Sequence, residues 1–343
     1  MSGIGILGVD ADLDTEIIVV ICPMVRRKRM KIGLADGVLV AYDEVKRSWV
    51  DVGSDVDHDV LTFLAAGPAA VARAAKRLAD YPGAMSGPPV GLPFNPTSFR
   101  DFSLWERHMV DAARGMVNQF APGGVQIAMR LYETLTQHVF PPLRPKRNFT
   151  RRPQFYFGNH ESVSADGAII EWPRYSRWLD FELELGVVLA HSVRNCTPQE
   201  GLSAVGGFVV LNDCTARDVQ WDDLRGSSFG AMVKSKTFAS AISSVVVTAD
   251  EMLSAWRDLR GEVWVNGQRW CSGSARGPSH GIGEMVAYAA ANETLQAGAL
   301  LGTGTFPGCS GIEIGRQLQP GDTVECRIDK IGSVTTTYGS VAS

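Results

Sequence analysis

Two glutamates separated by one residue, Glu182 and Glu184, stand in the otherwise largely apolar segment 179–189. In a β-strand, side chains alternate between the two faces, so both carboxylates would lie on one face and their apolar neighbours on the other. A solvent-exposed strand face would give the same pattern. The apolar run after Glu184 instead predicts burial, where two unpaired carboxylates are costly. A divalent cation between them would remove that cost.

A second group of polar residues follows the apolar segment 206–211. Asp213, Arg217 and Gln220 are spaced by four and then three residues, which places them on one face of a helical turn. The alternative is an N-cap aspartate with an Asp–Arg pair at the surface.

A third candidate pair, Asp101 and His108, is seven residues apart, which corresponds to two turns on one helix face. A single histidine of this kind can equally be a packed or surface side chain.

The elements that must position these residues are mostly short strands. Their alternating or apolar segments are 168–172, 181–189, 206–211, 244–248, 261–270 and 323–328. Asn266-Gly267 is expected to form a hairpin turn inside 261–270. Helical spacing covers 57–66, 68–81, 102–117 and 125–139. No alternation of strands and helices typical of a parallel sheet is present, so we predict a β-rich α+β fold.

Three regions are expected along the chain. Residues 1–29 combine an acidic, an apolar and a basic segment and are predicted to be an N-terminal extension. Residues 30–90 are predicted to form a small N-terminal α/β domain, beginning with two strands around the turn Asp36-Gly37. A Pro/Gly-rich passage, 82–96, leads into a catalytic domain, 91–343.

Composition excludes several classes of protein. The chain has 343 residues and a formal net charge of -4, and its basic residues are scattered, which argues against a nucleic-acid partner. The apolar run 17–25 is too short to span a bilayer, and it precedes its basic residues, unlike a signal peptide. The six cysteines form no CxxC or Cys/His cluster. We therefore predict a cytoplasmic protein with reduced thiols and no membrane association.

Taken together and in order, the polar motifs resemble the fumarylacetoacetate hydrolase family. They are Asp101 with His108, Pro153-Gln154-Phe155-Tyr156-Phe157-Gly158, Glu182 with Glu184, Asn212-Asp213 with Ala216-Arg217-Asp218 and Gln220, Lys234-Ser235-Lys236-Thr237-Phe238, Gly304-Thr305 and Glu313. The resemblance covers roughly residues 95–335. It implies a mixed β-sandwich roll for the catalytic domain and a homodimer.

The resemblance also implies a metal site. Its ligands would be Asp101, Glu182, Glu184 and Asp213. Four oxygen donors without cysteine or histidine favour Mg²⁺, Ca²⁺ or Mn²⁺ over zinc. Lys236 would lie near the metal, and we prefer it to Lys234 because it stands two residues before Phe238, as in the family pattern.

His108 is similar to the family's catalytic histidine, which activates water and is oriented by a glutamate that Glu313 matches. Arg217, Gln220 and Lys236 would assist catalysis, and Tyr156, Thr305 and Gln220 would contact the substrate. Two positions depart from the family: Asn159 stands in place of an arginine and Leu224 in place of a tyrosine. The substrate is therefore predicted to differ from fumarylacetoacetate.

The expected function is metal-dependent hydrolysis of a carbon–carbon bond in a β-diketone or acylpyruvate-type keto acid. A water activated by His108 would attack one carbonyl, and an enolate held at the metal would take up the charge. The alternatives are a decarboxylase or isomerase of a 2-hydroxy-dienoate or oxaloacetate-like acid on the same scaffold, and a non-catalytic protein that binds a metal or small molecule.

Overall fold

The computed structural model describes residues 29–80 and 85–341. All of the predicted extension except Arg29 therefore lies outside the described residues. Among the described helices, none combines the length and the apolar character needed to cross a membrane.

The larger of two main sheets has twelve strands and carries most of the polar motifs. Its path runs β4 (Met85–Ser86), β3 (Ser48–Asp51), β2 (Val38–Asp43), β1 (Lys31–Ala35), β14 (Val245–Thr248), β11 (Val205–Asp213), β10 (Glu182–Leu189), β17 (Ala299–Ser310), β5 (Ser98–Phe102) and β6 (Phe155–Gly158). Strand β13 (Ser240–Ile242) pairs with β11 and with β7 (Val163–Ser164).

The second main sheet has five strands and packs against the first. Its order is β16 (Gln268–Ser274), β15 (Arg260–Val265), β18 (Thr323–Ile328), β19 (Gly332–Val341) and β8 (Ala168–Trp172). A short third ladder joins β9 (Leu179–Asp180) to β12 (Thr215–Ala216).

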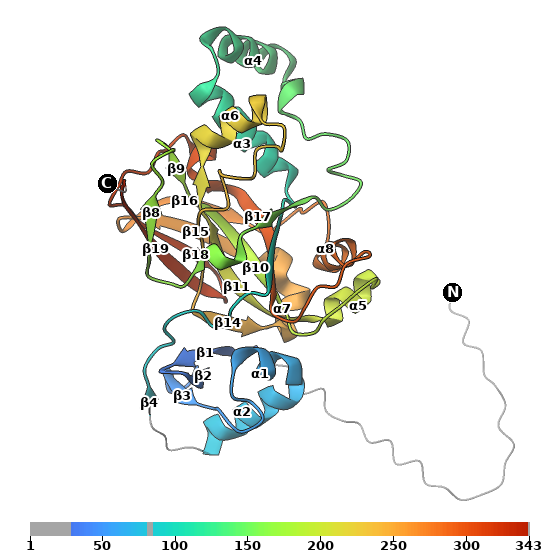
Figure 1. Ribbon diagram of the computed structural model, residues 1–343, viewed down its shortest axis with the longest axis vertical. Coiled ribbons are helices and arrows are strands. Elements are labelled where there is room, and N and C mark those ends of the chain that lie inside the picture. The colour runs from blue at the N-terminus through green and yellow to red at the C-terminus, as the bar shows by residue number, and fades with distance from the viewer. Residues whose placement is uncertain (1–28, 81–84, 342–343) are drawn as a thin grey trace, which may run out of the picture.

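The helices lie at the periphery of the sheets (Figure 1). They are α1 (Val60–Ala66), α2 (Pro68–Asp80), α3 (Glu106–Phe120), α4 (Gly123–Thr136), α5 (Pro198–Ser203), α6 (Arg217–Gly226), α7 (Ala249–Ala255), α8 (Ile282–Ala289) and α9 (Gly311–Ile314), with 3-10 turns η1 (Pro141–Leu143), η2 (His160–Ser162) and η3 (Trp256–Asp258). The prediction of a β-rich α+β fold is confirmed.

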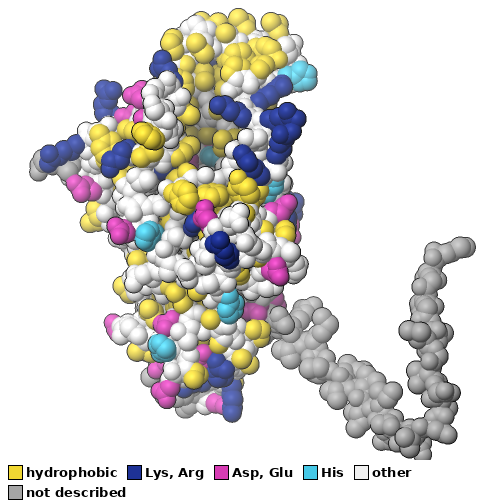
Figure 2. Space-filling view, turned by 45° about the vertical axis from the view of Figure 1, so that its right-hand side comes forward, with side chains coloured by type: hydrophobic (Ala, Val, Ile, Leu, Met, Phe, Trp, Pro, Cys, Tyr) yellow, Lys and Arg dark blue, Asp and Glu magenta, His cyan; other side chains and the backbone are white. Residues whose placement is uncertain are grey.

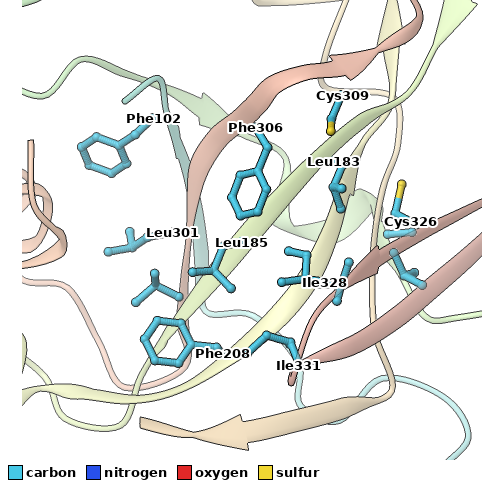
Figure 3. Packing of buried hydrophobic residues seen from close by; sticks show 14 of the residues in the cluster. Phe102, Leu183, Leu185, Phe208, Leu301, Phe306, Cys309, Cys326, Ile328 and Ile331 are labelled. Atoms are coloured by element: carbon cyan, nitrogen blue, oxygen red, sulfur yellow. The ribbon is translucent and has the colours of Figure 1, made fainter. Parts of the chain in front are cut away.

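The main hydrophobic core lies between the two sheets. Figure 3 shows side chains of β10, β11 and β17, among them Leu185, Phe208 and Phe306, with Ile328 of β18 and the neighbouring Ile331. All of these side chains are at least 98% buried. Every residue of β10 is buried, so its two glutamates cannot lie on a solvated face. The solvent-exposed alternative for this strand is therefore wrong.

Several local predictions are confirmed. The segments 168–172 and 323–328 are β8 and β18. Asn266 and Gly267 have φ values of 50° and 76°, the left-handed geometry that a type I′ turn between β15 and β16 requires. The strands β5, β6, β17 and β19 were not predicted, and β17 alone runs over 12 residues.

Two helical predictions are wrong at their N-terminal ends. Asp101 lies on β5, because that strand pairs in parallel with β17 and antiparallel with β6. The helix that carries His108 begins only at Glu106, so Asp101 and His108 do not share a helix face. Asp213 likewise ends β11, where it pairs with Ser240, and lies outside α6. In both places sheet pairing outweighs helical spacing.

The predicted N-terminal domain continues the larger sheet. Strand β1 pairs antiparallel with β14, with Lys31 opposite Val247. Helices α1 and α2 cover this end of the sheet, at the bottom of Figure 1. The domain boundaries at 29, 90 and 91 stay predictions.

Helix α4 projects from the opposite end of the molecule. Hydrophobic side chains gather at this end in Figure 2. The exposed apolar residues of the helix include Ile127, Leu131 and Leu135, and Met129 is its one buried residue among those described. This apolar face has no partner within the described chain.

Candidate active site

Three buried carboxylates from three strands converge at one end of the larger sheet. They are Asp101 on β5, Glu184 on β10 and Asp213 at the end of β11, and one oxygen from each lies within 4.8 Å of the others. Strand β17 lies between β10 and β5, and Gly302 of β17 is opposite Asp101. A Cβ atom at Gly302 would stand 2.2 Å from an Asp101 oxygen and 2.8 Å from a Glu184 oxygen. The glycine therefore permits the two carboxylates to approach each other across β17.

The chemistry of this cluster fits a hard divalent cation. Burial, and then repulsion from Asp213, raise the pKa of Asp101 well above its usual range. Burial and the charge of Asp101 do the same to the pKa of Glu184. The Oδ1 atom of Asp101 is also buried without a hydrogen-bond donor. An oxygen-binding cation would satisfy this acceptor and offset the repulsion.

Glu182 lies beside this cluster and is held by two cations. Its oxygens accept from Lys236 Nζ and Arg217 Nη2, each at 2.5 Å. Lys236 Nζ also contacts Asp213. The structure thus brings three of the four predicted ligands together, with Glu182 joined to them through Lys236. A ligand role for Glu182 stays a prediction.

Lys236 and Lys234, the two candidates for the lysine near the metal, differ in burial and in contacts. Lys236 is buried between Glu182 and Asp213, whereas Lys234 is exposed and lies 5.7 Å from the ring centroid of Tyr175. The nearby Asp213 and Glu182 more than offset the effect of burial, so the pKa of Lys236 is raised and its amine stays charged.

Two of the three predicted substrate contacts, Tyr156 and Thr305, touch the carboxylate cluster, whereas the third, Gln220, contacts Arg217. The Tyr156 hydroxyl lies 2.9 Å from Asp101 Oδ2 and 2.7 Å from Asp213 Oδ2. Burial and the Asp101 charge raise the pKa of Tyr156 well above its usual range, so the phenol keeps its proton. Glu184 accepts from the Gly304 amide at 3.0 Å and from Thr305 Oγ1 at 3.5 Å.

His108 and Glu313 meet where α3 packs against α9. His108 Nδ1 lies 3.1 Å from Glu313 Oε2, and His108 Nε2 lies 3.9 Å from Glu182 Oε1. Glu313 is itself fixed, because its oxygens accept from the Gly308 amide at 3.0 Å and from Ser310 Oγ at 2.7 Å. Burial alone lowers the pKa of His108, but Glu313 and then Glu182 outweigh it and raise that pKa overall.

Arg217 is 2% exposed, so the alternative of a surface Asp–Arg pair is wrong. It donates to Gln220 Oε1 at 2.9 Å, to Glu182 and, through Nε, to Asp180 Oδ2 at 2.7 Å. Asp180 was not predicted as a site residue. The same alternation that pairs Glu182 with Glu184 includes it, and that was the one signal in the sequence.

Of the two positions that depart from the family pattern, Asn159 is the N-cap of η2 and Leu224 lies on α6. Asn159 Nδ2 donates to Ser162 Oγ at 2.5 Å and to the Thr237 carbonyl at 3.3 Å. Leu224 is 59% exposed on α6. Neither side chain supplies a charge toward the cluster.

The α3–α9 contact depends on Gly115, which leads to a testable expectation. A Cβ atom at Gly115 would lie 2.1 Å from the Ile312 carbonyl oxygen, and backbone cannot yield as a flexible side chain can. Gly115→Ala should therefore lower the free energy of unfolding by about 1–3 kcal/mol and reduce turnover by displacing His108 from Glu313. Chemical denaturation and activity measurements test this.

Gly124→Ala in α4 is the matched control, because a Cβ there meets nothing within 4 Å. A Gly115→Ala variant as stable and as active as Gly124→Ala would contradict the expected crowding.

Comparison with known proteins agrees with this architecture. Residues 134–338 match the family described as fumarylacetoacetate (FAA) hydrolase C-terminal, which is more than half of the chain. The protein belongs to the fumarylacetoacetate hydrolase family. Asp101 and His108 precede the matched segment and join it through β5 and α3.

Two curated relatives and one solved structure illustrate the range of the family. The chain is 30% identical to a 2,4-didehydro-3-deoxy-L-rhamnonate hydrolase of Sphingomonas sp. (strain SKA58), over 53% of this chain and 63% of that protein. It is 30% identical to an oxaloacetate tautomerase of Bacillus subtilis (strain 168), over 56% of this chain and 60% of that protein. Less than two thirds of each relative is thus covered. A fumarylacetoacetate hydrolase of Exiguobacterium antarcticum shares the fold, with a TM-score of 0.62, 19% identity and 91% and 99% coverage.

Proposed function

We propose that the protein is a divalent-metal-dependent hydrolase that cleaves a carbon–carbon bond in a β-diketone or acylpyruvate-type acid. The observation that carries this proposal is the buried ion pair His108–Glu313, in which Nδ1 lies 3.1 Å from Glu313 Oε2 while Nε2 lies 3.9 Å from Glu182 Oε1. A histidine oriented in this way suits a general base for water.

Each residue has a definite part in this mechanism. Asp101, Glu184 and Asp213 would hold Mg²⁺, Ca²⁺ or Mn²⁺, with Glu182 as the further predicted ligand. When bound, the ion supplies Lewis-acid stabilisation of negative charge on the keto oxygens of the substrate. His108 would take a proton from water as the water oxygen bonds to one carbonyl carbon of the substrate. The bond from that carbon to the adjacent carbon would then break, its electron pair would leave as an enolate, and the protonated His108 would return the proton to the departing carbon. Glu313 would fix the imidazole orientation and stabilise its protonated form. The Lys236 ammonium and the Tyr156 hydroxyl supply donors beside the developing enolate.

A second candidate is a decarboxylase, isomerase or tautomerase acting on an oxaloacetate-like or 2-hydroxy-dienoate acid. Two observations favour it: one curated relative is named an oxaloacetate tautomerase, and the carboxylate cluster has proton donors in Tyr156 and Lys236 that do not involve His108. Such enolate chemistry needs no attacking water. A purely binding role is less well supported, because it leaves the buried His108–Glu313 pair without a purpose.

Product analysis in ¹⁸O-labelled water tests these proposals. Acetylpyruvate and oxaloacetate are each incubated with the protein and Mg²⁺, and the products are examined by mass spectrometry. Hydrolysis predicts that acetylpyruvate yields acetate carrying the label together with pyruvate. Loss of carbon dioxide, or conversion to an isomer of the same mass that ultraviolet absorbance separates from the starting acid, in either case without label in a new carboxylate, would favour the second candidate. No change in either acid would contradict both.

The cellular setting is also a proposal. We propose that the protein acts in the cytoplasm, which the absence of disulfides among the five described cysteines supports. We propose further that it is a homodimer, which the exposed apolar face of α4 supports. The replacement of the family's arginine and tyrosine by Asn159 and Leu224 supports a substrate other than fumarylacetoacetate.

A further inference from the structure

Asp180 lies between α9, which carries Glu313, and Arg217, which contacts Glu182. Its side chain is 99% buried at the end of β9. Oδ1 accepts from the amides of Gly311 at 2.7 Å and Phe181 at 2.8 Å. Oδ2 accepts from the Ile312 amide at 3.0 Å and from Arg217 Nε at 2.7 Å. Each carboxylate oxygen therefore has two donors.

The donors on one side belong to the start of α9, which carries Glu313. The packing there is close, because a Cβ at Gly311 would lie 2.3 Å from Asp180 Oδ1. Glu313 is two residues beyond Gly311, so the contact with Asp180 fixes the backbone from which the glutamate reaches His108.

The donor on the other side is the guanidinium of Arg217, which also holds Glu182 at 2.5 Å. Asp180 and Glu182 share this one buried cation. Asp180 thus links the turn that orients His108 to the arginine that orients Glu182, and a charge-assisted contact of this kind is strong when it is buried.

We propose that Asp180 is a positioning residue for the His108–Glu313 pair, acting by fixing the start of α9 and the guanidinium of Arg217. This inference rests on the proposed function, in which His108 activates water. Asparagine cannot replace the carboxylate, because its amide nitrogen would face two donors where an oxygen accepts from two.

A double-mutant cycle tests the proposal with acetylpyruvate and Mg²⁺. We expect Asp180→Asn to lower kcat by about 10–100-fold with little change in KM. In a Glu313→Gln background the same substitution should add little further loss, because residues that act through one another are non-additive. Fully additive losses would overturn the proposal. Asp57→Asn is the matched control, because Asp57 is also buried and accepts from Arg73 at 2.7 Å, but in the N-terminal part of the chain.

A second measurement does not depend on turnover. By NMR, the amides of Gly311 and Ile312 should exchange with solvent faster in Asp180→Asn than in Asp57→Asn, and the His108 ring nitrogen signals should shift. Unchanged exchange and unchanged His108 signals in folded Asp180→Asn would overturn the proposal. If acetylpyruvate is not turned over, the proposed function fails, while the NMR comparison still decides the role of Asp180.

Gly311→Ala provides the same test if Asp180→Asn does not fold. It keeps the Asp180 charge but crowds its contact with α9, so it should also accelerate exchange at Ile312 and lower kcat. Native exchange and native kcat in this variant would contradict the proposed path through α9.

Discussion

His108→Ala is expected to lower kcat by about 10²–10⁴-fold while the affinity for the metal stays nearly unchanged. The imidazole is held by Glu313 at 3.1 Å and is not part of the carboxylate cluster, so its removal takes away the base and leaves the proposed ligands in place. Steady-state kinetics with acetylpyruvate, combined with calorimetric titration of Mn²⁺, measure the two quantities separately.

Glu184→Gln is the complementary control for this experiment. Glu184 belongs to the carboxylate cluster, so this variant should lose metal affinity and, with it, turnover. A His108→Ala variant with near wild-type kcat would refute the water-activation role. The balance would then shift to decarboxylation or isomerisation, in which the metal carries most of the effect.

Exhaustive chelation should abolish turnover, with a loss of at least about 10³-fold, since the ion provides several kcal/mol of charge stabilisation. Mg²⁺ or Mn²⁺ should restore activity, and zinc should restore it poorly, because the cluster offers carboxylate oxygens and neither sulfur nor imidazole. Activity assays after EDTA treatment and metal re-addition test this. Undiminished activity in EDTA would count against every mechanism based on the cluster.

Calorimetric titration of Mn²⁺ at several pH values should show that the affinity for the metal rises with pH. The pKa values of Asp101 and Glu184 are raised in the folded protein, so between their ordinary values near 4 and the raised values the metal-free folded state binds more protons than the unfolded chain. The stability of the metal-free protein therefore falls as pH rises through that window. Metal binding must displace these protons, and an affinity independent of pH would contradict this assignment.

Much of the site could be predicted because its chemistry is local in sequence. The spacing of Glu182 and Glu184 and the apolar run after them define a buried strand with two carboxylates on one face, and β10 has that form. The turn at Asn266-Gly267 could also be predicted, because asparagine and glycine are the residues that adopt its left-handed backbone most easily.

What could not be predicted depends on contacts between distant segments. Helical spacing around Asp101 gave no sign of the partner β17, which makes 98–102 a strand. Gly302 is important because the carboxylates of Asp101 and Glu184 lie close to it. Asp180 is important because the start of α9 donates hydrogen bonds to it. Neither approach leaves a periodic pattern in the sequence.

The parallel pairing of β5 with β17 has a consequence for the order in which the protein folds. It joins Asp101 to Gly302, about two hundred residues further along the chain. Contacts of such high contact order close large loops and form slowly. We therefore expect the carboxylate cluster to be completed late, after most of the chain has collapsed. A bound ion would then stabilise the native state and not the folding transition state. It would therefore slow unfolding more than it speeds refolding.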